Sequence, residues 1–159
     1  MKRGCQYTFH LSRTVAARGS LGVIPDLRTL LRRAGRSVQQ GELPSLAEFS
    51  LSVILVSDDE LLALNRSALA HDYYTDILTF EIDRTETMLE AELYLSVDRA
   101  RDNARRAHVT LRTELRHLVI HGVLHLAGYT DKHRAEKNQM QKRERFYLTQ
   151  RAVRRQRAR

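Results

Sequence analysis

The chain has 159 residues, of which 42% are hydrophobic and 29% charged, and its formal net charge is +8. A chain of this length can bury roughly 70% of the surface that it exposes when unfolded, so a single compact domain is expected. It contains no apolar run of signal-peptide or membrane-spanning length, and its one cysteine, Cys5, cannot form an intramolecular disulfide. These features argue against membrane-spanning and disulfide-stabilised classes and predict a cytoplasmic protein.

The excess positive charge is concentrated at the C-terminus. Residues 151–159 contain five arginines and no acidic residue. We therefore expect residues 1–150 to form the domain and residues 151–159 to form a basic tail. The tail is either simply a solvated chain end or a segment that contacts RNA phosphates. Basic residues also gather at 32–36 and 99–106, where a solvated helix face and a polyanion-binding surface are both compatible with the pattern.

Hydrophobic periodicity and turn residues predict the elements in chain order. Alternating apolar residues predict strands at 6–11, 49–55, 76–82 and 91–97. A first helix is expected to begin at Pro25 and to end at Gly35, followed by a loop at 39–45. A second is expected after the capping box Ser57–Glu60, and a third after Asp98, which would be its N-cap. Two further helices are expected at 111–127 and 135–150. Because strands and helices do not alternate regularly, we expect an α+β fold with one mixed sheet of about four strands and about five helices, and a central helix that carries candidate metal ligands.

Two histidines in helix 111–127 indicate a metal site. His121 and His125 are four residues apart, which places their rings on the same face of a helix, one turn apart. A left-handed residue at Gly128 can end the helix and reverse the chain, so that Asp131 or His133 returns toward the two rings as a third ligand. Three protein ligands and one open position are typical of a catalytic zinc site, whereas a structural site is closed by four.

A histidine pair at this spacing is often only packed or exposed, and the glycine and the downstream ligands favour the metal-binding interpretation here. His117 lies on the same stripe, but His117 and His125 are separated by roughly 12 Å of helix rise and cannot bind one ion together. His117 is therefore expected to lie at the core edge or to support a ligand. Glu114, on the same stripe, either orients a histidine or is an ordinary acid near the helix start.

Gly122 argues against one class of metalloenzyme. In zinc peptidases with a similar histidine spacing, a glutamate follows the first histidine and takes a proton from water. Here that position is Gly122, which has no side chain. Cleavage of a phosphodiester has different needs: a metal that activates water or polarises a phosphoryl oxygen, and cations that offset the charge developing on phosphorus.

Three blocks of sequence resemble the YbeY family of bacterial rRNA maturation factors. Residues 121–131 resemble the family signature H-G-x-L-H-L-x-G-Y-D-H. Residues 64–80 are similar to L-N-x-x-(Y/F)-R-x-x-D-x-P-T-D-V-L-S-F, and residues 91–96 to G-(D/E)-I-x-I-S. Glu114, Met140 and Glu144 also fit the flanks of the family pattern, and the resemblance covers roughly residues 49–147.

The resemblance implies a zinc-dependent, single-strand-specific endoribonuclease that acts in maturation of the 3′ end of 16S rRNA and in ribosome biogenesis. It implies one zinc ion per chain, bound by His121, His125 and a third residue. We expect Asp131 in that place, because it is the first side chain after the Gly128 turn that can swing back and it stands ten residues after His121; His133 is the alternative. The partners would be ribosomal RNA, the small ribosomal subunit and ribosome-assembly proteins, with no membrane. The alternative is a non-catalytic RNA-binding or ribosome-binding assembly factor whose metal only braces the fold.

The sequence departs from the family pattern at three positions. The family's third histidine stands ten residues after the first, where this chain has Asp131, and His133 follows two residues later. A carboxylate can replace an imidazole on zinc at a similar distance. The family arginine of the second block falls on Leu69, and we name Arg66, His71 and Lys132 as candidates for the missing positive charge. Tyr74 replaces the proline before Thr75, which affects mainly the rigidity of that loop.

Overall fold

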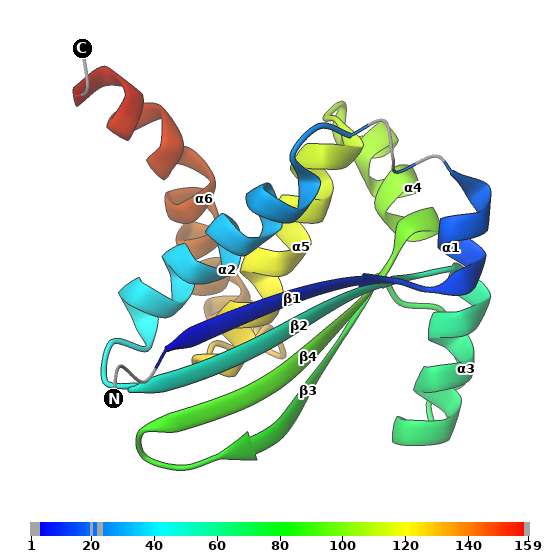
Figure 1. Ribbon diagram of the computed structural model, residues 1–159, viewed down its shortest axis with the longest axis horizontal. Coiled ribbons are helices and arrows are strands. Elements are labelled where there is room, and N and C mark those ends of the chain that lie inside the picture. Colours follow the sequence, from blue (N-terminus) through cyan, green and yellow to red (C-terminus); the bar gives the residue numbers. More distant parts are fainter. Residues whose placement is uncertain (1–3, 20, 22–23, 158–159) are drawn as a thin grey trace.

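This computed structural model describes residues 4–19, 21 and 24–157, which contain four strands and six helices (Figure 1). The strands are β1 (Cys5–Leu11), β2 (Glu48–Val56), β3 (Ile77–Arg84) and β4 (Met88–Ser96). The helices are α1 (Arg13–Arg18), α2 (Leu27–Glu42), α3 (Asp58–Leu69), α4 (Val97–Ala107), α5 (Leu111–Leu126) and α6 (Arg134–Arg157). The expected α+β class and mixed sheet are confirmed, and α1 is the one helix that sequence patterns did not predict.

The sheet has the order β1-β2-β4-β3. β1, β2 and β4 are parallel to one another, whereas β3 runs antiparallel to β4 as the first arm of a hairpin. In Figure 1, α2 and α5 lie across one face of this sheet, and α3 lies on its other side near the end where β2 and β4 stop. β1 and β3 are therefore the two edges of the sheet.

The main core lies between the sheet and α2, α5 and α6. Alternate residues of β2 and β4 face the helices, because side chains along a strand point to opposite faces in turn. These residues are almost fully buried: Phe49, Leu51, Val53, Leu55, Leu89, Ala91, Leu93 and Leu95. A smaller cluster of Val56, Leu61 and Leu78 attaches α3 to the opposite face. Among the described residues, no helix combines the length and apolarity that crossing a membrane requires.

The predicted end of α2 at Gly35 is wrong. The helix continues to Glu42, so the expected loop at 39–45 begins only after that residue. Gly35 is buried inside the helix, where an added Cβ would lie 3.1 Å from Cδ2 of Leu51 and 3.4 Å from Cε1 of Tyr7. Gly35 therefore allows α2 to pack closely on the sheet, and it does not end the helix.

The predicted helix starts are confirmed at one place and corrected at another. The capping box before α3 is formed: Ser57 accepts from the Glu60 amide at 3.2 Å, and Glu60 accepts from the Ser57 amide at 2.7 Å. The expected cap of the arginine-rich helix α4 is not Asp98 but Ser96, whose hydroxyl accepts from the Arg99 amide at 3.1 Å. Asp98 instead accepts hydrogen bonds from Arg18 and from the Asp58 amide.

The backbone of α6 continues as a helix through Arg157. The basic tail predicted at residues 151–159 therefore begins within this helix rather than after it. Its arginine side chains lie outside the described residues, so the RNA-binding interpretation of the tail stays a prediction.

At Gly122, α5 packs closely on side chains of the sheet. An added Cβ would lie 2.7 Å from Cδ2 of Leu93 and 3.0 Å from Cδ1 of Ile77. A glutamate side chain does not fit at this position unless the side chains of Leu93 and Ile77 move, which strengthens the argument against peptidase chemistry.

We predict that Gly122→Ala lowers the free energy of unfolding by about 1–3 kcal/mol, because the added methyl group overpacks a closed part of the core. Thermal and denaturant unfolding measure the change. Gly4→Ala is the matched control, since a Cβ at Gly4 meets nothing within 4 Å. Equal stability of the Gly122 variant and the wild type would show that α5 can move away from β4 at little cost.

Candidate metal centre

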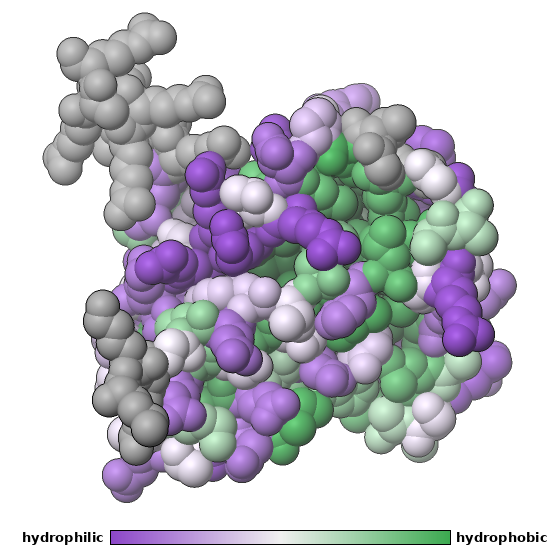
Figure 2. Space-filling model, viewed as in Figure 1, coloured by the Kyte–Doolittle hydropathy of each residue, from purple (hydrophilic) through white to green (hydrophobic). Residues whose placement is uncertain are grey.

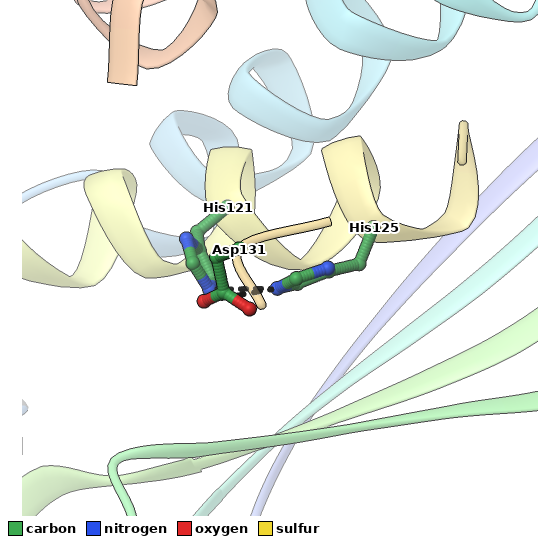
Figure 3. A group of neighbouring side chains, drawn as sticks. All are labelled: His121, His125 and Asp131. Atoms are coloured by element: carbon green, nitrogen blue, oxygen red, sulfur yellow. Dashed lines mark hydrogen bonds and ion pairs between the residues drawn. The ribbon is translucent and has the colours of Figure 1, made fainter. Parts of the chain in front are cut away.

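His121, His125 and Asp131 come together at the C-terminal end of α5 (Figure 3). One ligand atom from each residue lies within 4.8 Å of the other two. The Nε2 atoms of the two histidines are 2.9 Å apart, and Oδ2 of Asp131 lies 3.9 Å from Nε2 of His125. The cluster is partly exposed, so a ligand or water can reach it from solvent.

The chain reversal after α5 brings the carboxylate back. Gly128 has φ +99°, a conformation that side chains rarely adopt, and the Tyr129 amide donates to the Leu124 carbonyl at 3.1 Å. Only Tyr129 and Thr130 separate this turn from Asp131. The turn at Gly128 was expected from the sequence and is confirmed.

The outer nitrogen of each histidine faces an acceptor in the protein. Nδ1 of His121 lies 2.5 Å from Oε1 of Glu144, and Nδ1 of His125 lies 2.9 Å from the carbonyl oxygen of Tyr129. Both rings therefore carry their proton on Nδ1 when neutral, which leaves both Nε2 lone pairs directed into the cluster. This is the support that metal-binding histidines ordinarily receive from neighbouring acceptors.

The donor set fits a divalent cation. Two lone pairs that face each other at 2.9 Å repel unless a proton or a cation lies between them. Ligand atoms about 2.0–2.1 Å from a tetrahedral zinc ion lie about 3.3 Å apart, so a small adjustment of the two rings accommodates the ion. Burial, and then the neighbouring His121, lower the pKa of His125, which favours the neutral ring that binds metal.

A chain of buried and partly buried polar side chains continues from His121 along the wall between α5, α6 and α4. The second carboxylate oxygen of Glu144 lies 3.2 Å from Nε2 of His117, and Nδ1 of His117 lies 3.5 Å from Glu114. Glu114 in turn accepts from Asn103 at 3.2 Å. His117 therefore supports the cluster through Glu144, as one of the two sequence interpretations expected, and Glu114 contacts His117.

The charges in this chain are coupled. Hydrogen bonds to Glu114 and then Glu144 raise the pKa of His117 to about 10, so its ring is an imidazolium at neutral pH. Burial alone would raise the pKa of Glu144, but hydrogen bonds from His117 and His121 outweigh burial and hold that pKa at about 2. Glu144 is thus a permanent carboxylate, although it is buried.

Two hollows meet at the cluster. The larger, of about 610 Å³, lies between α5 and β3 and includes Tyr73 and both histidines in its wall. The smaller, of about 220 Å³, lies between α5, α4 and α6 and includes Lys137. Asp76, His121 and Asp131 line both hollows, so the ligand cluster stands at their junction.

Of the described residues that line either hollow, none is Arg66, His71, Lys132 or His133. Arg66 forms an exposed ion pair with Asp72, and His71 stacks on Tyr73 with ring centroids 5.2 Å apart. Leu69, at the position of the family arginine, is exposed. His133 lies outside the cluster of three ligand atoms that Asp131 joins.

Sequence reasoning missed two side chains that line the hollows, Tyr73 and Lys137, and did not single out Asp76. Asp76 and Tyr73 stand inside the second sequence block, and this was the available signal for them. Lys137 stands on α6, outside every block, and only the packing of α6 beside α5 brings it to the smaller hollow. The loop that carries Asp131 is also anchored far away in sequence, because the Tyr129 hydroxyl donates to Glu42 at 3.0 Å.

Comparison with known proteins identifies the family of the chain. The family model described as Endoribonuclease YbeY matches residues 24–152. The chain belongs to the endoribonuclease YbeY family. This confirms the resemblance seen in the three sequence blocks, and it extends the match to α2, for which sequence blocks gave no signal.

Individual relatives support the assignment. The chain is 44% identical over 119 residues to Endoribonuclease YbeY of Cytophaga hutchinsonii, a match that covers 75% of this chain and 79% of the relative. It is 36% identical over 118 residues to Endoribonuclease YbeY of Chloroherpeton thalassium, which covers 74% and 82%. The solution structure of TM1509 from Thermotoga maritima superposes with a TM-score of 0.59 at 26% identity and covers 91% of this chain and 87% of the other.

We predict that Asp131→Ala weakens zinc binding far more than His133→Ala, because only Asp131 lies with the two histidines. Zinc affinity is measured by competition with a chromophoric chelator on the two purified variants. A larger loss of affinity in the His133 variant would mean that the loop rearranges when metal binds and that the family register contains an insertion.

We predict that Glu144 and His117 stabilise the metal-free fold most strongly between about pH 4.5 and 6.5. The lowered pKa of Glu144 means that its contribution is present above its ordinary value of 4.5 and is lost as pH falls toward about 2. The raised pKa of His117 means that its contribution is present below 6.5 and is lost as pH rises toward about 10. Chemical unfolding of the wild type and Glu144→Gln across pH gives the difference, and a flat difference would contradict the coupling.

Proposed function

We propose that this chain is a zinc-dependent endoribonuclease that cleaves single-stranded RNA and acts on ribosomal RNA of the small subunit, at the 3′ end of 16S rRNA, in the cytoplasm. Membership of the endoribonuclease YbeY family supports the reaction class. The one observation that carries metal dependence is the pair of facing Nε2 atoms, each fixed by an acceptor on the other side of its ring.

The chain would hold one zinc ion with His121, His125 and Asp131 and leave a fourth position open. When bound, the ion supplies Lewis-acid activation of water and of a phosphoryl oxygen. Glu144 and the Tyr129 carbonyl fix the two rings before the substrate arrives, so little reorganisation is needed during the reaction. The negative end of the α5 dipole also favours a cation at this place.

The larger hollow suits a flexible single strand. It borders the exposed aromatic ring of Tyr73, which is backed by His71, and a base that is splayed out of a strand can stack on such a ring. Stacked bases inside a duplex cannot reach a side chain in this way. A preference for unpaired RNA is therefore expected from the shape of the site.

Lys137 is the strongest candidate for the charge that the family arginine supplies elsewhere. It lines the smaller hollow with His121 and Asp131, whereas Arg66 is already neutralised by Asp72. A lysine in this place can offset charge that develops on a phosphoryl group held at the junction of the hollows. Arg66, His71 and Lys132 remain weaker candidates, because none lines the two hollows.

We predict that the purified, chelator-treated protein cleaves a labelled single-stranded RNA only after zinc is restored, and that it leaves the matched duplex intact. His121→Ala and His125→Ala should abolish cleavage, since each removes a ligand, and Lys137→Gln should lower the rate while zinc binding is preserved. The control is His133→Ala, whose side chain lies outside the cluster. RNA binding without cleavage under every metal tested would favour the non-catalytic assembly factor.

A further inference from the structure

A stripe of arginines on α2 is left unexplained by the metal centre. Arg28, Arg32 and Arg36 are spaced four residues apart, so they lie on one face of the helix. All three are exposed, and within the described residues none pairs with a carboxylate. Like charges at this spacing repel each other and destabilise a helix. The stripe therefore acts against the stability of the free protein.

A third hollow lies beside this stripe, between α2 and the edge strand β1. It has a volume of about 420 Å³, and β1 supplies Tyr7, Thr8, Phe9 and His10 to its wall while α2 supplies Arg28, Thr29, Leu31 and Arg32. No acidic side chain lines it. In Figure 2 this face shows hydrophilic residues along α2 and a hydrophobic hollow beside them, above β1.

Two details of the hollow indicate a ligand with both an aromatic part and polar groups. The Arg28 guanidinium lies over the Phe9 ring, 5.3 Å from its centroid, so a flat cation and an aromatic ring already stand together at the rim. A second aromatic ring, that of Tyr7 on the same strand, also lines the wall of the hollow.

Arginines four residues apart stand about 6 Å apart along a helix axis. That spacing is comparable to the distance between successive phosphates of an extended single strand. Aromatic rings and guanidinium planes are the surfaces on which unpaired bases stack. A flat membrane surface would reach the arginines but not the rings inside the hollow, and an acidic peptide would leave the rings without a stacking partner.

We propose that the α2–β1 hollow and the arginine stripe bind the backbone of a single-stranded segment of RNA, with Arg28, Arg32 and Arg36 on successive phosphates and one unpaired base in the hollow. The segment would lie along β1, at the opposite edge of the sheet from β3 and the metal centre. This surface holds the RNA away from the place of cleavage. The proposal rests on the proposed function only for the assumption that the substrate is RNA.

The test compares binding of a labelled oligouridylate, followed by fluorescence anisotropy with metal-free protein at several salt concentrations. The triple variant Arg28→Gln, Arg32→Gln, Arg36→Gln removes three phosphate contacts, each of which adds about 0.7 to the slope of log K against log salt for single strands. The slope should fall by about 2, and the affinity at about 0.1 M salt should fall on the order of 100-fold. The thermal midpoint should stay close to that of the wild type, because relief of the repulsion within α2 offsets loss of the Arg28–Phe9 contact.

The matched control is Arg105→Gln, Lys142→Gln, Arg145→Gln, which removes the same charge from exposed positions on α4 and α6. This control should bind the oligonucleotide with nearly wild-type affinity and slope. If both triple variants lose the same affinity for the oligonucleotide, net charge alone explains the loss and the proposal is overturned. Unchanged binding in the α2 variant would also overturn it. A second variant, Phe9→Leu, should weaken binding with no change in slope, because it removes stacking and no charge.

Failure of this proposal and failure of the proposed function give different results. If the wild type cleaves RNA and the α2 variant binds it normally, only the α2–β1 site is wrong. If the α2 variant loses RNA binding but the zinc-loaded wild type cleaves no RNA, the proposed binding site is supported and the proposed endoribonuclease function is wrong.

Discussion

The close approach of α5 to the sheet at Gly122 is the constraint on which the arrangement of the site depends. With no side chain at this position, the helix packs directly on Leu93 and Ile77. His121, the next residue toward the N-terminus, is thereby held at the border of the larger hollow, and His125 follows one turn later beside β3. A bulkier residue would lift α5 and move both rings away from the strand that forms the opposite wall.

Hydrogen-bond acceptors beside the two histidines then fix the orientation of their rings, which the packing of α5 does not determine. The position of α5 does not determine how the histidine rings are rotated or which nitrogen carries the proton. Glu144 from α6 and the Tyr129 carbonyl from the following turn decide both, since each accepts from an Nδ1. Glu144 can stay ionised inside the protein because His117 and Glu114 extend the chain of opposite charges behind it. Glu144, His117 and Glu114 thus organise the cluster from the wall of the smaller hollow.

The α2 helix illustrates how one element serves two surfaces. Its inner face contributes Leu31, Ala34 and Val38 to the core, and its C-terminal residue Glu42 receives hydrogen bonds from Tyr129 and Tyr147. The same helix presents its arginines outward along β1. Stabilising contacts and uncompensated positive charge are therefore separated on opposite faces of a single helix, which lets the fold tolerate the repulsion along the stripe.

The sequence by itself determined the fold class, the four strands, the capping box before α3, the histidine pair and the glycine turn, because each depends on local spacing that periodicity reveals. It misjudged Gly35 and Asp98, since a glycine that ends a helix and one that packs against a sheet look alike in sequence, as do neighbouring capping residues. The sequence also favoured Asp131 over His133 as the third ligand, and the structure brings Asp131 to the two histidines. Only the tertiary structure decided that Glu144 supports His121 and that Lys137 reaches the smaller hollow. Those outcomes depend on contacts between α5, α6 and the following loop, and the relative placement of packed elements is not encoded in the spacing within any one of them.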